Sequence, residues 1–180
     1  MKLIAVSDTH IHDAHIPHNI IDIIDDCDII VHAGDFTSME CYKVFASTGK
    51  LKAVCGNSDE VKLKKLLPDR IKFEVEGIKI GVVHKGGLSI TNTTAVRYLA
   101  LEMGVDILIF GHIHSPLIEK SDVMIVCPGS PTSPRMADPT VVELIIKNGS
   151  VSGRIIELKG KCCDYVTFSR NLGKHGGDRE

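Results

Sequence analysis

The chain has 180 residues, of which 43% are hydrophobic and 24% charged, with a formal net charge of −2. This length and apolar fraction suit one globular domain, and no run of about eighteen uncharged apolar residues predicts a membrane span. Aromatic residues make up only 4% of the chain, and a chain with few stacking side chains and no basic stripe is not expected to bind nucleic acid. The apolar run at the N-terminus is too short for a signal peptide, so we expect a cytoplasmic protein without a membrane partner.

Six cysteines are present and none has the C-x-x-C spacing: Cys27, Cys41, Cys55, Cys127, Cys162 and Cys163. The first four lie in apolar runs, so we interpret them as small buried hydrophobic residues in a reducing compartment. A zinc site built from thiolates is therefore not expected.

Strand-like and helix-like stretches alternate along the chain. Continuous apolar runs predict buried strands at residues 2–6, 28–33, 51–55 and 105–110. Apolar residues recur every three or four positions in the stretches between them, which predicts helices at 19–27 and 38–47.

A third helix is predicted at 92–104, with Asn92 as the expected cap and Gly104 as the expected end. Its apolar stripe consists of Val96, Leu99, Ala100 and Met103. The spacing of these four residues places them on one face of a helix, which would pack against a sheet.

Two β-hairpins interrupt the alternation. Gly77 separates two alternating runs within residues 71–83, and Asn148–Gly149 is a strong two-residue hairpin signal. The mixture predicts an α/β fold with two mixed β-sheets packed as a sandwich and flanked by helices. We expect one domain over residues 1–159, followed by a partly disordered C-terminal tail at 160–180.

Residues of metal-ligand type follow the predicted strands at the point where each strand ends. They are Asp8, His10, Asp35, Asn57, His84, His112 and His114. Sites in α/β sheets collect at the carboxyl ends of strands, so we expect these side chains at one edge. Two carboxylates, an amide oxygen and four imidazoles exceed the needs of one tetrahedral ion, which indicates two divalent cations. Mixed oxygen and imidazole ligation favours Mn²⁺, Fe²⁺, Ni²⁺, Co²⁺ or Zn²⁺ over Ca²⁺.

Each of these residues alone also has an ordinary structural interpretation. Asp8 and His10 fit a turn or a helix cap, and His84 fits a hydrogen-bonded core histidine. The repeated placement of such residues directly after apolar strands favours the metal site. His32 lies inside an apolar run, and we interpret it as structural.

A resemblance to the calcineurin-like metallophosphoesterase superfamily rests on the order and spacing of five motifs. They are DTH at 8–10, GDF at 34–36, GNSD at 56–59, His84 and GHIH at 111–114. The chain resembles the compact phosphodiesterase branch of bacteria and archaea over about residues 1–158, including CPGSPTSPR at 127–135. The resemblance implies a metallophosphoesterase fold, in which two mixed sheets lie between helices.

The resemblance also implies a role for each ligand position. The ligands of the first metal would be Asp8, His10 and His114. Those of the second metal would be Asn57, His84 and His112, with Asp35 as the bridge. The expected cofactors are two divalent ions, with Mn²⁺ first and Ni²⁺, Fe²⁺, Co²⁺ or Zn²⁺ as alternatives. Relatives of this kind are often dimers or tetramers, so a homodimer and a homotetramer are both candidate oligomeric states.

Two positions depart from the pattern of many family members. Ser58 stands where a histidine often protonates the leaving group, and serine is no general acid near neutral pH. We therefore expect a preference for good leaving groups. Lys85 follows His84 where relatives often have HGH, and it is a candidate for contacting substrate phosphate. Arg135 is a second candidate for substrate binding, beside a purely structural role.

The function that these residues predict is a dinuclear metal-dependent phosphoesterase. It would be a phosphodiesterase that hydrolyses small phosphodiesters with a hydroxide bridging the metals. The expected catalytic residues are Asp35, Asn57 and His112. A protein-binding scaffold of the same fold is the alternative, because a retromer subunit resembles this family with a degraded metal site. The complete ligand set of this chain favours the enzyme over the scaffold, and the absence of a basic stripe disfavours a nuclease.

Overall fold

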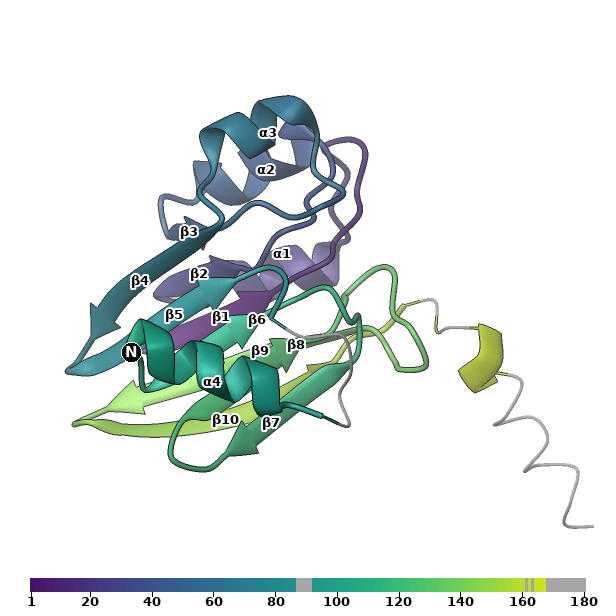
Figure 1. Ribbon diagram of the computed structural model, residues 1–180. Coiled ribbons are helices and arrows are strands. Elements are labelled where there is room, and N and C mark those ends of the chain that lie inside the picture. Colours follow the sequence, from purple (N-terminus) through teal and green to yellow (C-terminus); the bar gives the residue numbers. More distant parts are fainter. Residues whose placement is uncertain (87–91, 161, 163, 168–180) are drawn as a thin grey trace, which may run out of the picture.

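The computed structural model describes residues 1–86, 92–160, 162 and 164–167. Within them, two five-stranded mixed sheets pack face to face, and helices cover both outer faces (Figure 1). None of the helices in this part of the chain is long and apolar enough to cross a membrane.

The first sheet has the strand order β10-β9-β1-β2-β3. Its strands are β1 (Lys2–Val6), β2 (Ile29–His32), β3 (Leu51–Ala53), β9 (Thr140–Lys147) and β10 (Ser150–Glu157). β1, β2 and β3 are parallel, whereas β9 and β10 form an antiparallel hairpin beside β1. The parallel half therefore sends three successive loops from the same edge.

The second sheet has the strand order β4-β5-β6-β8-β7. Its strands are β4 (Arg70–Val75), β5 (Ile78–Val83), β6 (Ile107–Phe110), β7 (Pro116–Lys120) and β8 (Met124–Pro128). β5, β6 and β8 are parallel, and β4 and β7 are antiparallel edge strands. Each sheet thus has three neighbouring parallel strands, whose carboxyl ends lead into loops.

Helices cover the outer face of each sheet. They are α1 (His18–Asp25), α2 (Met39–Ser47), α3 (Val61–Leu66) and α4 (Thr94–Met103). Side chains of α1, α2 and α3 pack on the first sheet, and those of α4 pack on the second sheet, across which α4 lies in Figure 1. The result is an arrangement of four layers, helix–sheet–sheet–helix.

This layering explains why the central strands are continuously apolar. In β1, Leu3 and Ala5 point into the core between the sheets, whereas Ile4 and Val6 point toward the helices. A strand that is buried on both faces cannot alternate apolar and polar residues. The predicted α/β sandwich and both of its hairpins are therefore confirmed.

Several element bounds differ from the sequence prediction. Strands β2, β3 and β6 are one or two residues shorter than predicted at some ends. The N-cap of α4 is Thr93, while Asn92 accepts a hydrogen bond from the amide of Thr94 at 3.2 Å, and Gly104 ends the helix with a φ of 61°. Asn92 was predicted to be the cap, but it forms a turn one residue before the cap.

Three elements were not predicted. Helix α3 has six residues and a single buried side chain, Leu63, so it carries no readable period. Strand β7 begins with Pro116 and its residues are only partly buried, which is typical of an edge strand, and β8 pairs with it.

The predicted tail is described only in part. Residues 164–167 form one helical turn, where the sequence predicted no regular element. Residues 161, 163 and 168–180 of the predicted tail lie outside the described residues.

Two neighbouring isoleucines of β9 test the packing between the sheets. Ile146 is fully buried in the core between the sheets, whereas Ile145 is 38% exposed. Ile146→Ala should lower the free energy of unfolding by about 2–5 kcal/mol because it leaves a cavity. Ile145→Ala should cost about 1 kcal/mol or less. Urea unfolding of the two variants gives the comparison, and equal losses would contradict the packing described above.

Candidate metal centre

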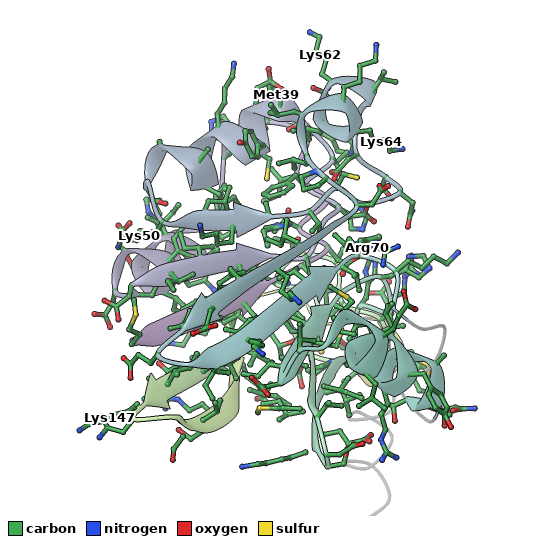
Figure 2. All side chains as sticks on the ribbon, turned by 60° about the vertical axis from the view of Figure 1, so that its left-hand side comes forward. Met39, Lys50, Lys62, Lys64, Arg70 and Lys147 are labelled. Carbon is green, nitrogen blue, oxygen red and sulfur yellow. The ribbon has the colours of Figure 1, made fainter. Side chains whose placement is uncertain are left out.

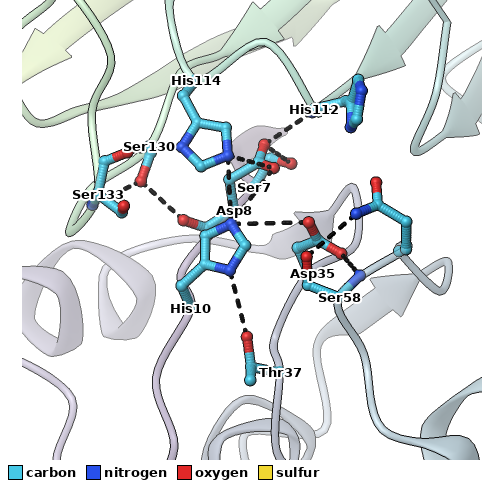
Figure 3. A network of polar contacts seen from close by, with 12 residues as sticks. Ser7, Asp8, His10, Asp35, Thr37, Ser58, His112, His114, Ser130 and Ser133 are labelled. Atoms are coloured by element: carbon cyan, nitrogen blue, oxygen red, sulfur yellow. Dashed lines mark hydrogen bonds and ion pairs between the residues drawn. The ribbon is translucent and has the colours of Figure 1, made fainter.

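The candidate ligands lie in loops that leave the carboxyl ends of the strands. Four of them follow the parallel strands of the first sheet: Asp8, His10, Asp35 and Asn57. The other three follow β5 and β6 of the second sheet: His84, His112 and His114. Because these strands are parallel within each sheet, the loops converge at one edge of the sandwich (Figure 3).

The backbone of these loops is strained. Five of the seven candidate ligands have a positive φ: Asp8, His10, Asp35, His112 and His114. This conformation costs a residue other than glycine roughly 1 kcal/mol or more. Strain of this kind concentrates at functional sites, where the surrounding structure must hold it.

One group of ligand atoms comes from both sheets. Asp8, His10 and His114 each offer an atom, and these atoms lie within 4.8 Å of one another. Asp8 Oδ1 is 3.3 Å from His114 Nε2 and 4.0 Å from His10 Nε2. The two Nε2 atoms are 3.2 Å apart. Three atoms so close together can share one small cation.

A second group lies beside the first and consists of Asp8, Asp35 and His84. His84 Nε2 is 3.4 Å from Asp35 Oδ2 and 3.0 Å from the amide oxygen Oδ1 of Asn57. Asp35 Oδ2 is also 3.6 Å from His10 Nε2. The Asp35 carboxylate therefore lies between a histidine of each group.

Hydrogen bonds fix which nitrogen of two histidines faces the site. His114 Nδ1 donates to the carbonyl oxygen of Ser133 at 2.6 Å, and His84 Nδ1 donates to that of Ala33 at 2.8 Å. In a neutral imidazole the single proton is then on Nδ1, and Nε2 is the nitrogen with a lone pair that can bind a metal. Hydrogen bonds of this kind typically orient metal-binding imidazoles.

Burial controls protonation at the site. Desolvation lowers the pKa of His10, His112 and His114, so these rings are neutral near pH 7, which is the form that binds metal. Desolvation also raises the pKa of Asp8, although a 2.6 Å hydrogen bond from the Ser7 hydroxyl to Asp8 Oδ2 opposes this. A nearby positive charge would favour the ionised form of this carboxyl.

The arrangement of the ligand atoms favours a bound cation. Asp8 Oδ1 is buried and has no hydrogen-bond partner among the described residues. It faces the lone pair of His114 at 3.3 Å, and Asp35 Oδ2 lies 3.4 Å from His84 Nε2. Acceptors facing acceptors at these distances repel one another, and a bound cation would remove the repulsion. Carboxylate, amide oxygen and imidazole together suit divalent transition metals.

Comparison with known proteins agrees with this chemistry. The family described as the calcineurin-like phosphoesterase superfamily domain matches residues 1–149. The chain belongs to this superfamily. A protein of Methanothermobacter thermautotrophicus described as a probable metallophosphoesterase is 36% identical over 173 residues, which are 94% of this chain and 100% of that protein.

Solved structures share the fold. A protein described as a novel archaeal phosphodiesterase is 25% identical, with a TM-score of 0.65 over 87% of this chain and 100% of that one. Vps29 of Entamoeba histolytica, described in complex with Zn²⁺, is 22% identical, with a TM-score of 0.69 over 87% of this chain and 99% of that one. The metallophosphoesterase fold predicted from the sequence is therefore confirmed.

Two glycines of the phosphoesterase motifs allow the loops to approach closely. A Cβ on Gly56 would collide with the carboxylate and backbone nitrogen of Asp35, and one on Gly111 would collide with the Ser7 hydroxyl and press on the Asp8 carboxylate. These positions need glycine because side chains and backbone of neighbouring loops fill the space.

Asp59 joins two ligand loops, a role that the sequence analysis did not assign. Its buried carboxylate accepts hydrogen bonds from the amides of Gly56 at 2.7 Å, Thr37 at 2.7 Å and Asp35 at 3.3 Å. Desolvation raises the pKa of Asp59, and these amides oppose the shift. Its partners lie more than twenty residues away in the sequence, apart from Gly56. In the sequence Asp59 stands out only as the last residue of the GNSD motif, which does not reveal these contacts.

A second support comes from the segment after β8. The Ser130 hydroxyl donates to the carbonyl oxygen of Asp8 at 2.7 Å, and Ser133 supplies the carbonyl that orients His114. In the sequence this segment stands out only by its resemblance to relatives. It holds two of the three ligands of the first group, Asp8 and His114, in place (Figure 3).

His112 lies at the edge of the site. Its backbone amide donates to Asp8 Oδ2 at 2.9 Å, and its half-buried ring lies 5.3 Å from the ring of His84 between centroids. Among the described residues, His112 belongs to neither of the two groups of closely spaced ligand atoms. Its role as a metal ligand stays a prediction.

Lys85 and Arg135 lie on different sides of the centre. The exposed Lys85 lines a cavity beside Asn57 and His84. The backbone amide of Arg135 donates to the carbonyl oxygen of His114, and its charge contributes to the lowered pKa of His10 and His114. Contact of either residue with substrate stays a prediction.

Asp59→Asn tests the support of the ligand loops. An amide cannot accept all three hydrogen bonds, so the affinity for Mn²⁺ should fall about 10- to 100-fold. Calorimetric titration of the metal-free protein measures it, with Asp22→Asn on the exposed face of α1 as the matched control. Unchanged affinity in a folded Asp59→Asn protein would show that Asp59 does not position the ligands.

Proposed function

We propose that this phosphoesterase hydrolyses small phosphodiesters with two divalent cations. Asp8, His10 and His114 would hold the first cation. Asn57, His84 and His112 would hold the second, with Asp35 shared between the two. One observation supports this proposal: a single carboxylate oxygen lies close to a histidine of each ligand group. Asp35 Oδ2 is 3.6 Å from His10 Nε2 and 3.4 Å from His84 Nε2.

Cations bound there would neutralise negative charge on the phosphate oxygens and would make water a stronger nucleophile. The protein's part is to hold the donors rigidly. The amide of Ser58 donates to Asp35 Oδ1 at 2.7 Å, which fixes that carboxylate and leaves Oδ2 for the site. Mn²⁺ is our first choice of metal and the cytoplasm our proposed location.

The three expected catalytic residues all belong to the proposed two-cation centre. Asp35 and Asn57 would hold and orient the centre, and the half-buried ring of His112, 5.3 Å from that of His84 between centroids, would contribute a ligand beside the reacting phosphate. The Ser58 hydroxyl accepts a hydrogen bond from the side-chain amide of Asn57 at 3.1 Å. It offers no acid near neutral pH, which favours substrates whose leaving group needs no proton.

A diester is favoured over a monoester by two considerations. One solved neighbour is described as an archaeal phosphodiesterase. In addition, the cavity beside Asn57 and His84 gives a second ester arm a place to lie. Lys85 in that cavity and Arg135 near His114 are the proposed contacts of the substrate anion.

A protein-binding scaffold is the second candidate function, because several Vps29 structures share the fold with TM-scores of up to 0.71. The strained ligand loops and the unpartnered Asp8 oxygen favour the enzyme, since a scaffold gains nothing from either.

Hydrolysis of bis(4-nitrophenyl) phosphate tests the proposed function. Metal-free protein should be inactive, activity should return with added Mn²⁺, and Asp35→Asn should lower kcat/KM at least about a hundredfold because it removes the shared carboxylate. His15→Gln, whose ring is 92% exposed, is the control and should retain full activity. Absence of turnover with every metal, in a protein that still binds two ions, would support the scaffold instead.

A further inference from the structure

A cavity of about 500 Å³ opens directly beside the second ligand group. His84 of that group and Asn57 line it. Three basic residues from different elements complete it: Lys64 of α3, Arg70 at the start of β4 and Lys85 after β5. A volume of this size accommodates a small organic group.

The described residues that line this cavity carry more positive than negative charges. Lys64, Arg70 and Lys85 face a single carboxylate among the described lining residues, that of Asp69. The Cys55 thiol donates to Asp69 Oδ1 at 3.2 Å, and burial raises the pKa of this thiol to about 11, so Cys55 adds no negative charge near pH 7. The local excess of positive charge contrasts with the net charge of −2 of the whole chain.

The basic groups are placed to meet a ligand that extends from the metal centre. Lys64 Nζ donates to the carbonyl oxygen of Asn57 at 2.6 Å, so its ammonium lies against a ligand loop. Arg70 Nη1 is 3.6 Å from Glu102 Oε1, and both side chains are more than 60% exposed. Figure 2 shows Lys64 and Arg70 on the same side of the molecule, whereas Lys62 points away at the top.

The rest of the lining limits the kind of group that fits. Val83 and Leu99 provide an apolar wall. None of the described residues that line the cavity is phenylalanine, tyrosine or tryptophan, so it lacks the large aromatic side chains on which nucleobases usually stack. An aliphatic chain with an anionic end matches both the apolar wall and the basic rim.

We infer that this cavity binds one ester arm of the substrate, and that the arm is a short aliphatic chain with a second anionic group. The inference rests on the proposed function and adds the substrate class. The phosphodiester lies at the metal centre, and the arm extends past Asn57 toward Lys64, Arg70 and Lys85. The natural substrate is then a diester with at least one negative charge beyond the phosphate.

Two matched diesters test this inference. One is 4-nitrophenyl 3-sulfopropyl phosphate and the other is 4-nitrophenyl butyl phosphate, which share the leaving group and differ in the charge of the arm. The sulfopropyl diester should have a kcat/KM about tenfold higher, and added KCl should reduce this preference. The ratio of the two values cancels effects on the phosphate itself.

Variants of the cavity should change that ratio in opposite directions. Arg70→Gln and Lys64→Gln should each lower it about threefold or more, whereas Asp69→Asn should raise it. Lys62→Gln removes a lysine of the same helix that does not line the cavity, and it should leave the ratio unchanged. A wild-type ratio near one, or equal effects of the changes at 62 and 64, would overturn the inference.

Binding to the metal-free protein separates the inference from the proposed function. Calorimetry should show that the sulfopropyl diester binds more tightly than the butyl diester, and that Arg70→Gln removes most of the difference. Equal dissociation constants would overturn the cavity assignment. Tighter binding of the sulfopropyl diester, without hydrolysis of either diester under any metal, would overturn the proposed function and leave an anion-binding cavity.

Discussion

The structure depends on one electrostatic constraint, which is that acceptor atoms from two sheets face one another at the carboxyl ends of the strands. Asp8 Oδ1 and His114 Nε2 are 3.3 Å apart, and Asp35 Oδ2 and His84 Nε2 are 3.4 Å apart. Such an arrangement is unfavourable without positive charge between the atoms. The packed core of the sandwich holds these atoms together in spite of their repulsion. A bound cation would remove the repulsion, and this relief would add to the free energy of cation binding.

The protein holds this arrangement with groups that do not face the metal site. The Asp59 carboxylate binds the amides of two ligand loops, and Ser130 and Ser133 fix Asp8 and His114. These hydrogen bonds offset the strain of the positive-φ ligand positions, each worth roughly 1 kcal/mol or more. The Ser133 carbonyl also fixes the direction of the His114 ring in the first group, as the Ala33 carbonyl does for the His84 ring in the second.

Much of this architecture could be predicted from the sequence. The central strands are continuously apolar because helices or a second sheet cover each face, and the ligands follow strand ends because parallel strands end at one edge. Helix α3 and strand β7 were missed because Leu63 alone gives no period and Pro116 opens a half-exposed edge strand. The role of Asp59 and the charge of the cavity depend on contacts between distant segments, which no local pattern encodes.

The central claim is that the converging acceptors form two metal sites that share Asp35. Its most direct test is to count the ions bound by the metal-free protein after equilibrium dialysis against Mn²⁺, by elemental analysis together with electron paramagnetic resonance. The account predicts two Mn²⁺ per chain with magnetic coupling between them, because one carboxylate contacts both. Binding of one ion or none, or two ions without coupling, would contradict it.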